Sequence, residues 1–159
     1  MGLADNDLER RIAVIEDNLA IQEVVYNYCF KQDQRDIEGF LNLMNEDVVL
    51  RFRGWGLEVK GKEALKKYFL EEVFAGHEYN MHQITNLTIK VDGETAQCEA
   101  YLALRSSADG EPQEAGIRYM MQLRKEDKKW GLSEINCEVV TWKGSLAPQD
   151  KAVYERFTV

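Results

Sequence analysis

Apolar residues at helical spacing dominate the first fifth of the chain. They recur every three or four positions, as Ile12, Ile15, Leu19, Ile21, Val24, Val25 and Tyr28. This period predicts an amphipathic helix from residue 7 to about residue 31, in which Asn18 marks either a bend or the cap of a second helix. A similar apolar face predicts a short helix over residues 36–44.

The remainder of the chain changes to strand patterning, with one further helix. An apolar face predicts that this helix follows Gly61 and ends at Gly76. The predicted strands are residues 48–53, 57–59, 81–91, 95–106, 114–125 and 130–142. The Asp92-Gly93 pair is a strong hairpin signal between two of the long strands.

This order of elements predicts an α+β fold, with the helices gathered on one face of a largely antiparallel sheet. The 159 residues fit a single domain. We assign residues 1–144 to that domain and residues 145–159 to a C-terminal tail that packs on it.

Charge and cysteine usage narrow the class of protein. The chain has 28 acidic and 20 basic residues, which disfavours nucleic-acid binding because that binding depends on Lys and Arg. No apolar run approaches the ~20 residues that cross a membrane, and the N-terminus lacks the apolar stretch of a signal peptide. Cys29, Cys98 and Cys137 are far apart and odd in number, which favours buried thiols and a reducing cytoplasm.

Asp33 and His82 are the residues of greatest chemical interest. Asp33 ends the first predicted helix, where the helix dipole disfavours a negative charge by roughly 0.3–1 kcal/mol. A residue placed against a local preference often has a function, although a solvated helix end is the simpler interpretation. An imidazole beside a carboxylate forms a proton-transfer pair, because the carboxylate fixes the tautomer and stabilises the cation.

The position of His82 in the predicted strand 81–91 argues against burial of its side chain. Strict alternation places His82 on the more polar face of that strand, together with Ile84, Asn86, Thr88 and Lys90. A solvent-facing histidine is therefore the plain interpretation. A β-bulge would turn the first residues of the strand into the interior.

Several segments together resemble a known family. The stretch AIQEVVYNYCFKQDQRDIEGFLNLMNEDVVL, the stretch GLEVKGKEALKKYF, the histidine-bearing HEYNMHQITNLTI and the closing KKWGLSEINCEVVTW follow one another in its order. Over residues 8–142 the chain is similar to the SnoaL-like, scytalone dehydratase-like family of the nuclear transport factor 2-like superfamily. The resemblance implies a cone-shaped α+β barrel, in which a curved mixed or antiparallel sheet wraps around N-terminal helices and encloses a hydrophobic pocket.

The resemblance also implies site residues and a type of chemistry. Asp33 matches the aspartate at the family's helix end and His82 matches its strand histidine. Both are therefore expected to be catalytic, in acid–base elimination or isomerisation of a small hydrophobic cyclic molecule without a cofactor. The expected substrate-binding residues are Tyr28, Trp55, Arg118, Tyr119 and Asn136. Most such aromatic residues are plain core, and Asn136 also fits a half-exposed strand.

Two expectations concern partners. The chain has two histidines, at a spacing that matches no metal-ligand pattern, so we expect neither a metal nor an organic cofactor. Apolar positions on the long strands exceed what three helices can cover, which predicts a homodimer or higher homo-oligomer through the open face of the sheet. The alternative to an enzyme is a non-catalytic small-molecule-binding or dimerisation module of the same fold.

Overall fold

A computed structural model describes residues 3–53 and 56–144. The elements follow the order α1 (Leu3–Asp33), α2 (Ile37–Leu41), β1 (Met44–Arg53), β2 (Leu57–Lys60), α3 (Lys62–Tyr68), the π-helical turn η1 (Phe69–Val73), α4 (Phe74–Gly76), β3 (Tyr79–Asp92), β4 (Thr95–Ala108), β5 (Glu111–Glu126) and β6 (Lys129–Lys143). The predicted tail, residues 145–159, lies outside the described residues, and so does Trp55.

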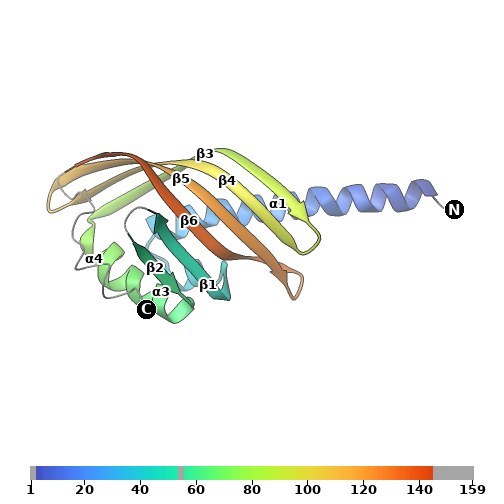
Figure 1. Cartoon of the computed structure of the whole chain (residues 1–159), viewed down its shortest axis with the longest axis horizontal. Coiled ribbons are helices and arrows are strands. Elements are labelled where there is room, and N and C mark those ends of the chain that lie inside the picture. Colours follow the sequence, from blue (N-terminus) through green and yellow to red (C-terminus); the bar gives the residue numbers. More distant parts are fainter. Residues whose placement is uncertain (1–2, 54–55, 145–159) are drawn as a thin grey trace.

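The six strands form one curved sheet in the order β2-β1-β6-β5-β4-β3. The β1 strand runs parallel to β6, and the other neighbouring strands are antiparallel. The long strands arch over α1, and α3 lies on the same side of the sheet (Figure 1). The predicted α+β fold with a mixed, curved sheet around N-terminal helices is therefore confirmed, and the sheet remains unclosed.

The core lies between the concave face of the sheet and the helices. Residues from α1, α2, β4, β5 and β6 meet there, including Ile21, Tyr28, Phe40, Leu102, Leu123 and Ile135, all of which are buried. Each large apolar side chain stabilises the fold by roughly 1.5–3 kcal/mol relative to its exposure to water. This packing fixes the second half of α1 against the sheet.

The first helix differs from its prediction in two ways. It is one continuous helix, and the Asn18 amide donates back to the Val14 carbonyl at 2.7 Å instead of capping a second helix. The predicted single stripe is in fact two. Ile21 is fully buried, whereas Ile15 and Leu19 are 59% and 60% exposed. The two rows lie on opposite sides of the helix, and the first part of α1 also projects beyond the end of the sheet (Figure 1).

A β-bulge in β3 changes which face of the sheet one half of the strand presents relative to the other half. Thr85 pairs with Tyr101 and Thr88 pairs with Glu99, so β3 has one residue more than β4 in this interval. Asn86 lies within the bulge at φ 56°, in the left-handed region that Asn tolerates better than most residues. His82 and Ile84 therefore share the inner face with Leu87, although strict alternation had placed them on opposite faces.

A second β-bulge, in β6, changes which side chains of that strand face the core. Gln122 pairs with Glu134 and Leu123 with Leu132, which leaves Ser133 as the extra residue. Strict alternation along this strand would place Leu132 on one face with Glu134, Asn136 and Glu138. Because of the bulge, Leu132 packs inward while those polar residues lie on the outer face.

Candidate functional site

A tight corner between α1 and α2 positions Asp33. Arg35 adopts φ 55°, and the Asp36 amide donates to the Lys31 carbonyl at 2.9 Å, so the helix ends within two residues of Asp33. The Asp36 carboxylate then caps α2 by accepting from the Gly39 amide at 2.9 Å, and it pairs with the Lys31 ammonium at 2.7 Å. These contacts fix the direction in which α1 presents its last carboxylate.

The start of β3 brings His82 to that carboxylate. The Arg35 guanidinium donates to the His77 carbonyl, which ties the α1–α2 corner to the segment before β3. His82 Nδ1 lies 2.5 Å from Asp33 Oδ1, and the His82 amide donates to Asp33 Oδ2 at 3.0 Å. The predicted hydrogen bond between these two residues is present, and it uses both carboxylate oxygens.

The contact assigns different roles to the two ring nitrogens of His82. A carboxylate only accepts hydrogen bonds, so Nδ1 carries the proton in the neutral ring and Nε2 keeps a free lone pair. In the described part of the chain, no hydrogen bond occupies Nε2. The His82 side chain is 7% exposed and that of Asp33 is 21% exposed, so the pair is shielded from most of the solvent.

Tyr28 and Tyr119, two of the predicted substrate-binding residues, meet inside the core. Their rings pack edge to face with centroids 5.8 Å apart, and their hydroxyls share a hydrogen bond. Burial raises the pKa of both hydroxyls well above the ordinary value. Burial also raises the pKa of the neighbouring Cys29 thiol to about 12, with a smaller contribution from the charge of Asp33.

Arg118 and Asn136 lie on the other side of the sheet. The Arg118 guanidinium pairs with Glu99 at 2.9 Å and its side chain is 41% exposed, whereas the Asn136 amide donates to the Glu134 carboxylate at 2.6 Å. The strand alternation and the β6 bulge direct both side chains to the outer face, so the structure does not bring either residue to the His82–Asp33 pair. His77 is also apart from the pair, since its Nδ1 lies 2.9 Å from the Val73 carbonyl.

Ser106 is an inner-face residue that the sequence did not single out. His82 pairs with Leu104 across the β3–β4 ladder, so Ser106, two residues further on the same face, is a diagonal neighbour about 7–8 Å away. Its hydroxyl is buried and has no hydrogen-bond partner among the described residues. The available signal was a polar residue that ends the inner-facing series Ala96, Cys98, Ala100, Leu102 and Leu104.

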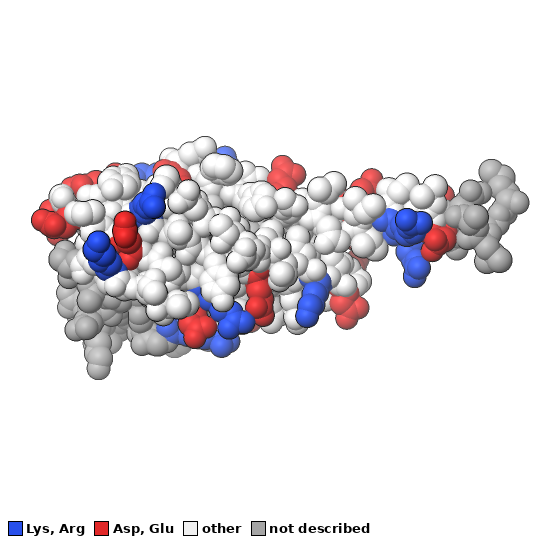
Figure 2. Space-filling view, turned by 90° about the horizontal axis from the view of Figure 1, so that it is seen from above, with Lys and Arg blue, Asp and Glu red and all other residues white. Residues whose placement is uncertain are grey.

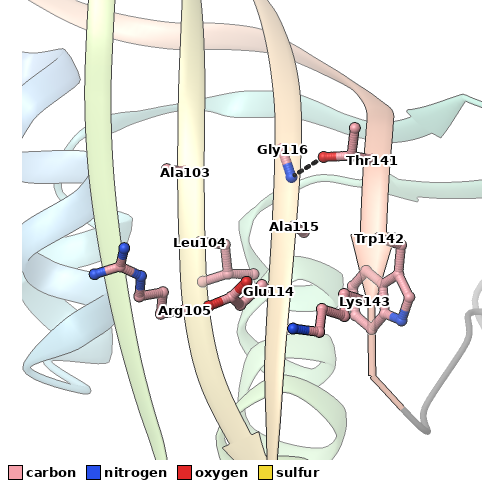
Figure 3. A pocket seen from close by; sticks show the side chains of 9 residues that line it. All are labelled: Ala103, Leu104, Arg105, Glu114, Ala115, Gly116, Thr141, Trp142 and Lys143. Atoms are coloured by element: carbon pink, nitrogen blue, oxygen red, sulfur yellow. Dashed lines mark hydrogen bonds between the residues drawn. The ribbon is translucent and has the colours of Figure 1, made fainter.

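A pocket of about 290 Å³ lies at the ends of β4, β5 and β6, and Leu104 of β4 is one of its lining residues. Figure 3 shows its lining, which is Ala103, Leu104, Arg105, Glu114, Ala115, Gly116, Thr141, Trp142 and Lys143. The Gly116 amide donates to the Thr141 hydroxyl at 3.1 Å. Neither Asp33 nor His82 lines this pocket. Most of its lining residues, Arg105 and Glu114 among them, alternate onto the outer face of the sheet, whereas His82 lies on the inner face.

Within residues 3–53 and 56–144, no group of three or more His, Cys, Asp or Glu side chains is arranged to hold a metal ion. Over the same residues, no helix has the length and apolar character needed to span a membrane.

Comparison with known proteins places the chain. A SnoaL-like domain model matches residues 13–136. This chain belongs to the SnoaL-like family. The match confirms the resemblance drawn from the sequence. An uncharacterized protein of Mycobacterium tuberculosis is 28% identical over 85 residues, which are 54% of this SnoaL-like chain and 57% of the relative. The chain therefore spans little more than half the length of the curated relatives that it matches.

Solved structures share the SnoaL-like architecture. A candidate aromatic ring hydroxylase from Novosphingobium aromaticivorans is 29% identical, with a TM-score of 0.77 over 84% of this chain and 96% of that protein. A hexachlorocyclohexane dehydrochlorinase from Novosphingobium barchaimii is 17% identical, with a TM-score of 0.77 over 89% of this chain and 95% of the other. At 17% identity the likeness shows the fold alone.

Proposed function

We propose that this SnoaL-like protein is a cofactor-independent lyase or isomerase that acts on a small hydrophobic cyclic molecule. The observation that carries the proposal is the 2.5 Å contact between His82 Nδ1 and Asp33 Oδ1 in a shielded position. Family membership and the similarity to a dehydrochlorinase fold support the class of reaction. A ligand screen followed by an activity assay identifies the substrate and the bond that is broken.

In this mechanism His82 Nε2 is the general base. It takes a proton from a carbon next to an electron-withdrawing group, and the electron pair of that C–H bond forms the new double bond. In elimination, a hydroxyl or halide then leaves with its own bonding pair, and a leaving hydroxyl takes its proton from the imidazolium. In isomerisation, the imidazolium returns the proton to a different carbon. The Asp33 charge stabilises the imidazolium throughout.

The buried tyrosine pair and Ser106 have supporting roles in the proposal. Tyr28 and Tyr119 keep their protons because burial raises the pKa of both, so they add no charge to the core. Ser106 supplies a hydroxyl donor on the same face as His82. The three free, buried cysteines support the further proposal that the protein works in a reducing cytoplasm.

The test begins with a thermal-shift screen against hydrophobic cyclic ketones, alcohols and halides. A ligand at a hundredfold excess over Kd stabilises the native state by about 2.7 kcal/mol. Each hit is then assayed for elimination or double-bond migration. The His82→Ala variant should lower kcat by roughly 10²–10⁴-fold, the range for a lost general base. A chelator should leave the rate unchanged, because the described residues offer no metal-ligand group.

The matched control is Gln83→Ala, which removes an exposed side chain from the next position of the same strand. It should keep the parent rate. Circular dichroism on each variant separates lost catalysis from lost folding. A folded His82→Ala protein with full activity would reject the proposed chemistry, and binding without turnover of any hit would favour a non-catalytic binding module.

A further inference from the structure

The outward face of α1 carries a row of exposed apolar side chains, which Gln22 interrupts between Leu19 and Tyr26. The row consists of Leu8, Ile12, Ile15, Leu19, Tyr26 and Phe30, each at least 39% exposed. Ile15, Leu19 and Phe30 reach 59–60%. Single exposed apolar residues are ordinary on a protein surface, but a row along one helix marks an interaction site. We call these six residues the α1 seam.

The α1 seam points away from the rest of the molecule. At 3.6 residues per turn, Ile21, Val25 and Tyr28 lie on the opposite side of the helix from the seam. Those three residues are buried against the sheet and the other helices. Among the described residues the seam is exposed both in the part of α1 that projects beyond the sheet and in the part that crosses beneath it (Figure 1).

The spacing of the seam is that of a coiled coil. Leu8, Ile12, Ile15 and Leu19 follow at intervals of four, three and four residues, which is the alternation of the two core positions in a heptad. Gln22 occupies the following core position, and Tyr26 the one after it, seven residues after Leu19; Phe30 lies beside this repeat. An identical helix carries the same row, so two copies of α1 can interlock residue for residue.

The charges beside the seam fit a second copy in parallel. Arg11 and Glu16 lie on opposite flanks of the seam, five residues apart, so they cannot pair within one helix. Within the described chain neither residue forms an ion pair, although the neighbouring Arg10 pairs with Asp7 at 3.3 Å. In a parallel pair of helices, these two positions meet across the interface, Arg11 of each copy facing Glu16 of the other.

The opposite orientation is disfavoured by the same charges. An antiparallel pair brings identical flanks together, and one flank of the seam carries Glu9, Glu16 and Glu23. That arrangement sets two rows of like charge beside each other. We therefore propose that α1 binds α1 of a second copy in parallel, through the α1 seam, with the two sheets on the outside of the pair.

The outer face of the sheet is the competing surface for self-association. It exposes Tyr79, Met81, Tyr101 and Val140, but the Arg118–Glu99 ion pair also lies on this face. Seen from above, acidic and basic side chains lie beside each other at several places and form no large patch of one sign (Figure 2). The α1 seam has more exposed large apolar residues than the sheet face, and it has the heptad spacing in addition.

The first experiment measures the mass of the full chain in solution by light scattering at tens of micromolar. The parent protein should be a dimer, and the Ile12→Asp/Ile15→Asp double variant should be a folded monomer. Two single variants serve as controls and should stay dimeric. Val14→Asp changes an exposed apolar residue of α1 outside the seam, and Val140→Asp changes the outer face of the sheet. A monomeric parent, or a dimer that survives the double variant, would overturn the proposal.

The second experiment tests the orientation without disturbing the apolar row. Arg11→Glu and Glu16→Arg, each alone, should raise the dimer Kd roughly tenfold, because two favourable contacts become two like-charge contacts. The combined variant should restore the parent Kd. If Glu16→Arg alone tightens the dimer, the helices are antiparallel and the proposal fails. Leu8→Cys provides an independent readout, since only a parallel pair places the two introduced thiols within disulfide range.

Discussion

Asp33 acts on His82 through two separate atoms. One carboxylate oxygen contacts the ring at Nδ1 and the other accepts from the His82 backbone amide. The backbone contact holds the strand against the end of α1, so the ring is oriented even before it gains a proton. A single carboxylate therefore performs two tasks, the positioning of β3 and the stabilisation of a cationic ring.

The two tasks can be separated with the Asp33→Asn variant. The introduced amide keeps the size of the side chain and one oxygen acceptor, but it removes the charge that stabilises the imidazolium. A hydrogen bond to a charged group contributes about 1.5–3 kcal/mol, so kcat should fall by roughly 10–100-fold. Steady-state kinetics on the substrate identified above, together with a urea titration, provide the measurement.

A neighbouring aspartate supplies the control for this variant. Asp36→Asn changes a carboxylate three residues away that caps α2 and pairs with Lys31, without contact to His82. Its kcat should match the parent, and its free energy of unfolding should fall modestly because a cap is weakened. Equal losses of kcat in both variants would assign the effect to the helix corner and not to the charge on His82.

The elements themselves were predictable because each carries a strong local pattern. The helical period before residue 31, the Asp92-Gly93 turn and the alternation in the last three strands all appear in the structure within a few residues. The facing of the strands was not predictable from alternation alone. Asn86 and Ser133 each add one residue to a strand, and every side chain beyond such a bulge changes face.

The two bulges have opposite effects on the candidate site. The bulge at Asn86 brings His82 onto the inner face, where the resemblance had placed it, whereas the bulge at Ser133 removes Asn136 from that face. Only long-range pairing with β4 and β5 determines where a bulge is accommodated. The position of each bulge therefore depends on residues of the partner strands, which are far away in the sequence from the side chains that change face.

Asn86 provides a direct test of the bulge. Its φ of 56° is the left-handed region, which costs a residue with a Cβ roughly 1–2 kcal/mol. Asn86→Val should lower the free energy of unfolding by about that amount, because a β-branched residue tolerates the conformation worst. Asn86→Gly should stay within about 1 kcal/mol of the parent, since glycine adopts it freely. Urea unfolding of both variants makes the comparison.

The adjacent residue is the matched control. Thr85 is exposed and pairs with Tyr101 immediately before the bulge, so Thr85→Val introduces the same side chain into ordinary strand geometry. Its stability should equal that of the parent or exceed it slightly. If Asn86→Val and Thr85→Val behave alike, β3 does not hold Asn86 in the left-handed region.

At the scale of the whole molecule, α1 shows that a helical period does not predict which of its apolar residues are buried. The sequence predicted its length and its apolar residues, but the period does not reveal that these residues form two separate rows. One row is buried in the core with Ile21 and Val25, and the other, with Ile15 and Leu19, remains exposed. The distinction depends on which side of the helix faces the sheet, which is a property of the assembled fold and not of the helix.

The closed core also predicts how the molecule responds to alkali. Burial raises the pKa of the Cys29 and Cys98 thiols from the ordinary 9.0 to about 12. Above pH 9 the unfolded chain loses these protons while the folded chain keeps them, so the unfolded state is favoured as pH rises. The stability that the protonated thiols contribute is fully present below pH 9 and is lost progressively toward pH 12. Each thiol adds a slope of at most roughly 1.4 kcal/mol per pH unit.

Urea titrations under reducing conditions at pH 7, 8, 9, 10 and 10.5 measure this dependence. The free energy of unfolding should change little between pH 7 and 8 on account of these groups and should fall from pH 9 onward. In Cys98→Ala the fall should be shallower, because one raised pKa is removed, whatever the variant does to stability at pH 7. Tyr28 and Tyr119 act in the same direction, since burial raises the pKa of both hydroxyls above the ordinary 10.0. A parent protein equally stable at pH 8 and pH 10.5, or a Cys98→Ala variant with the parent's slope, would contradict the burial of these thiols in the core.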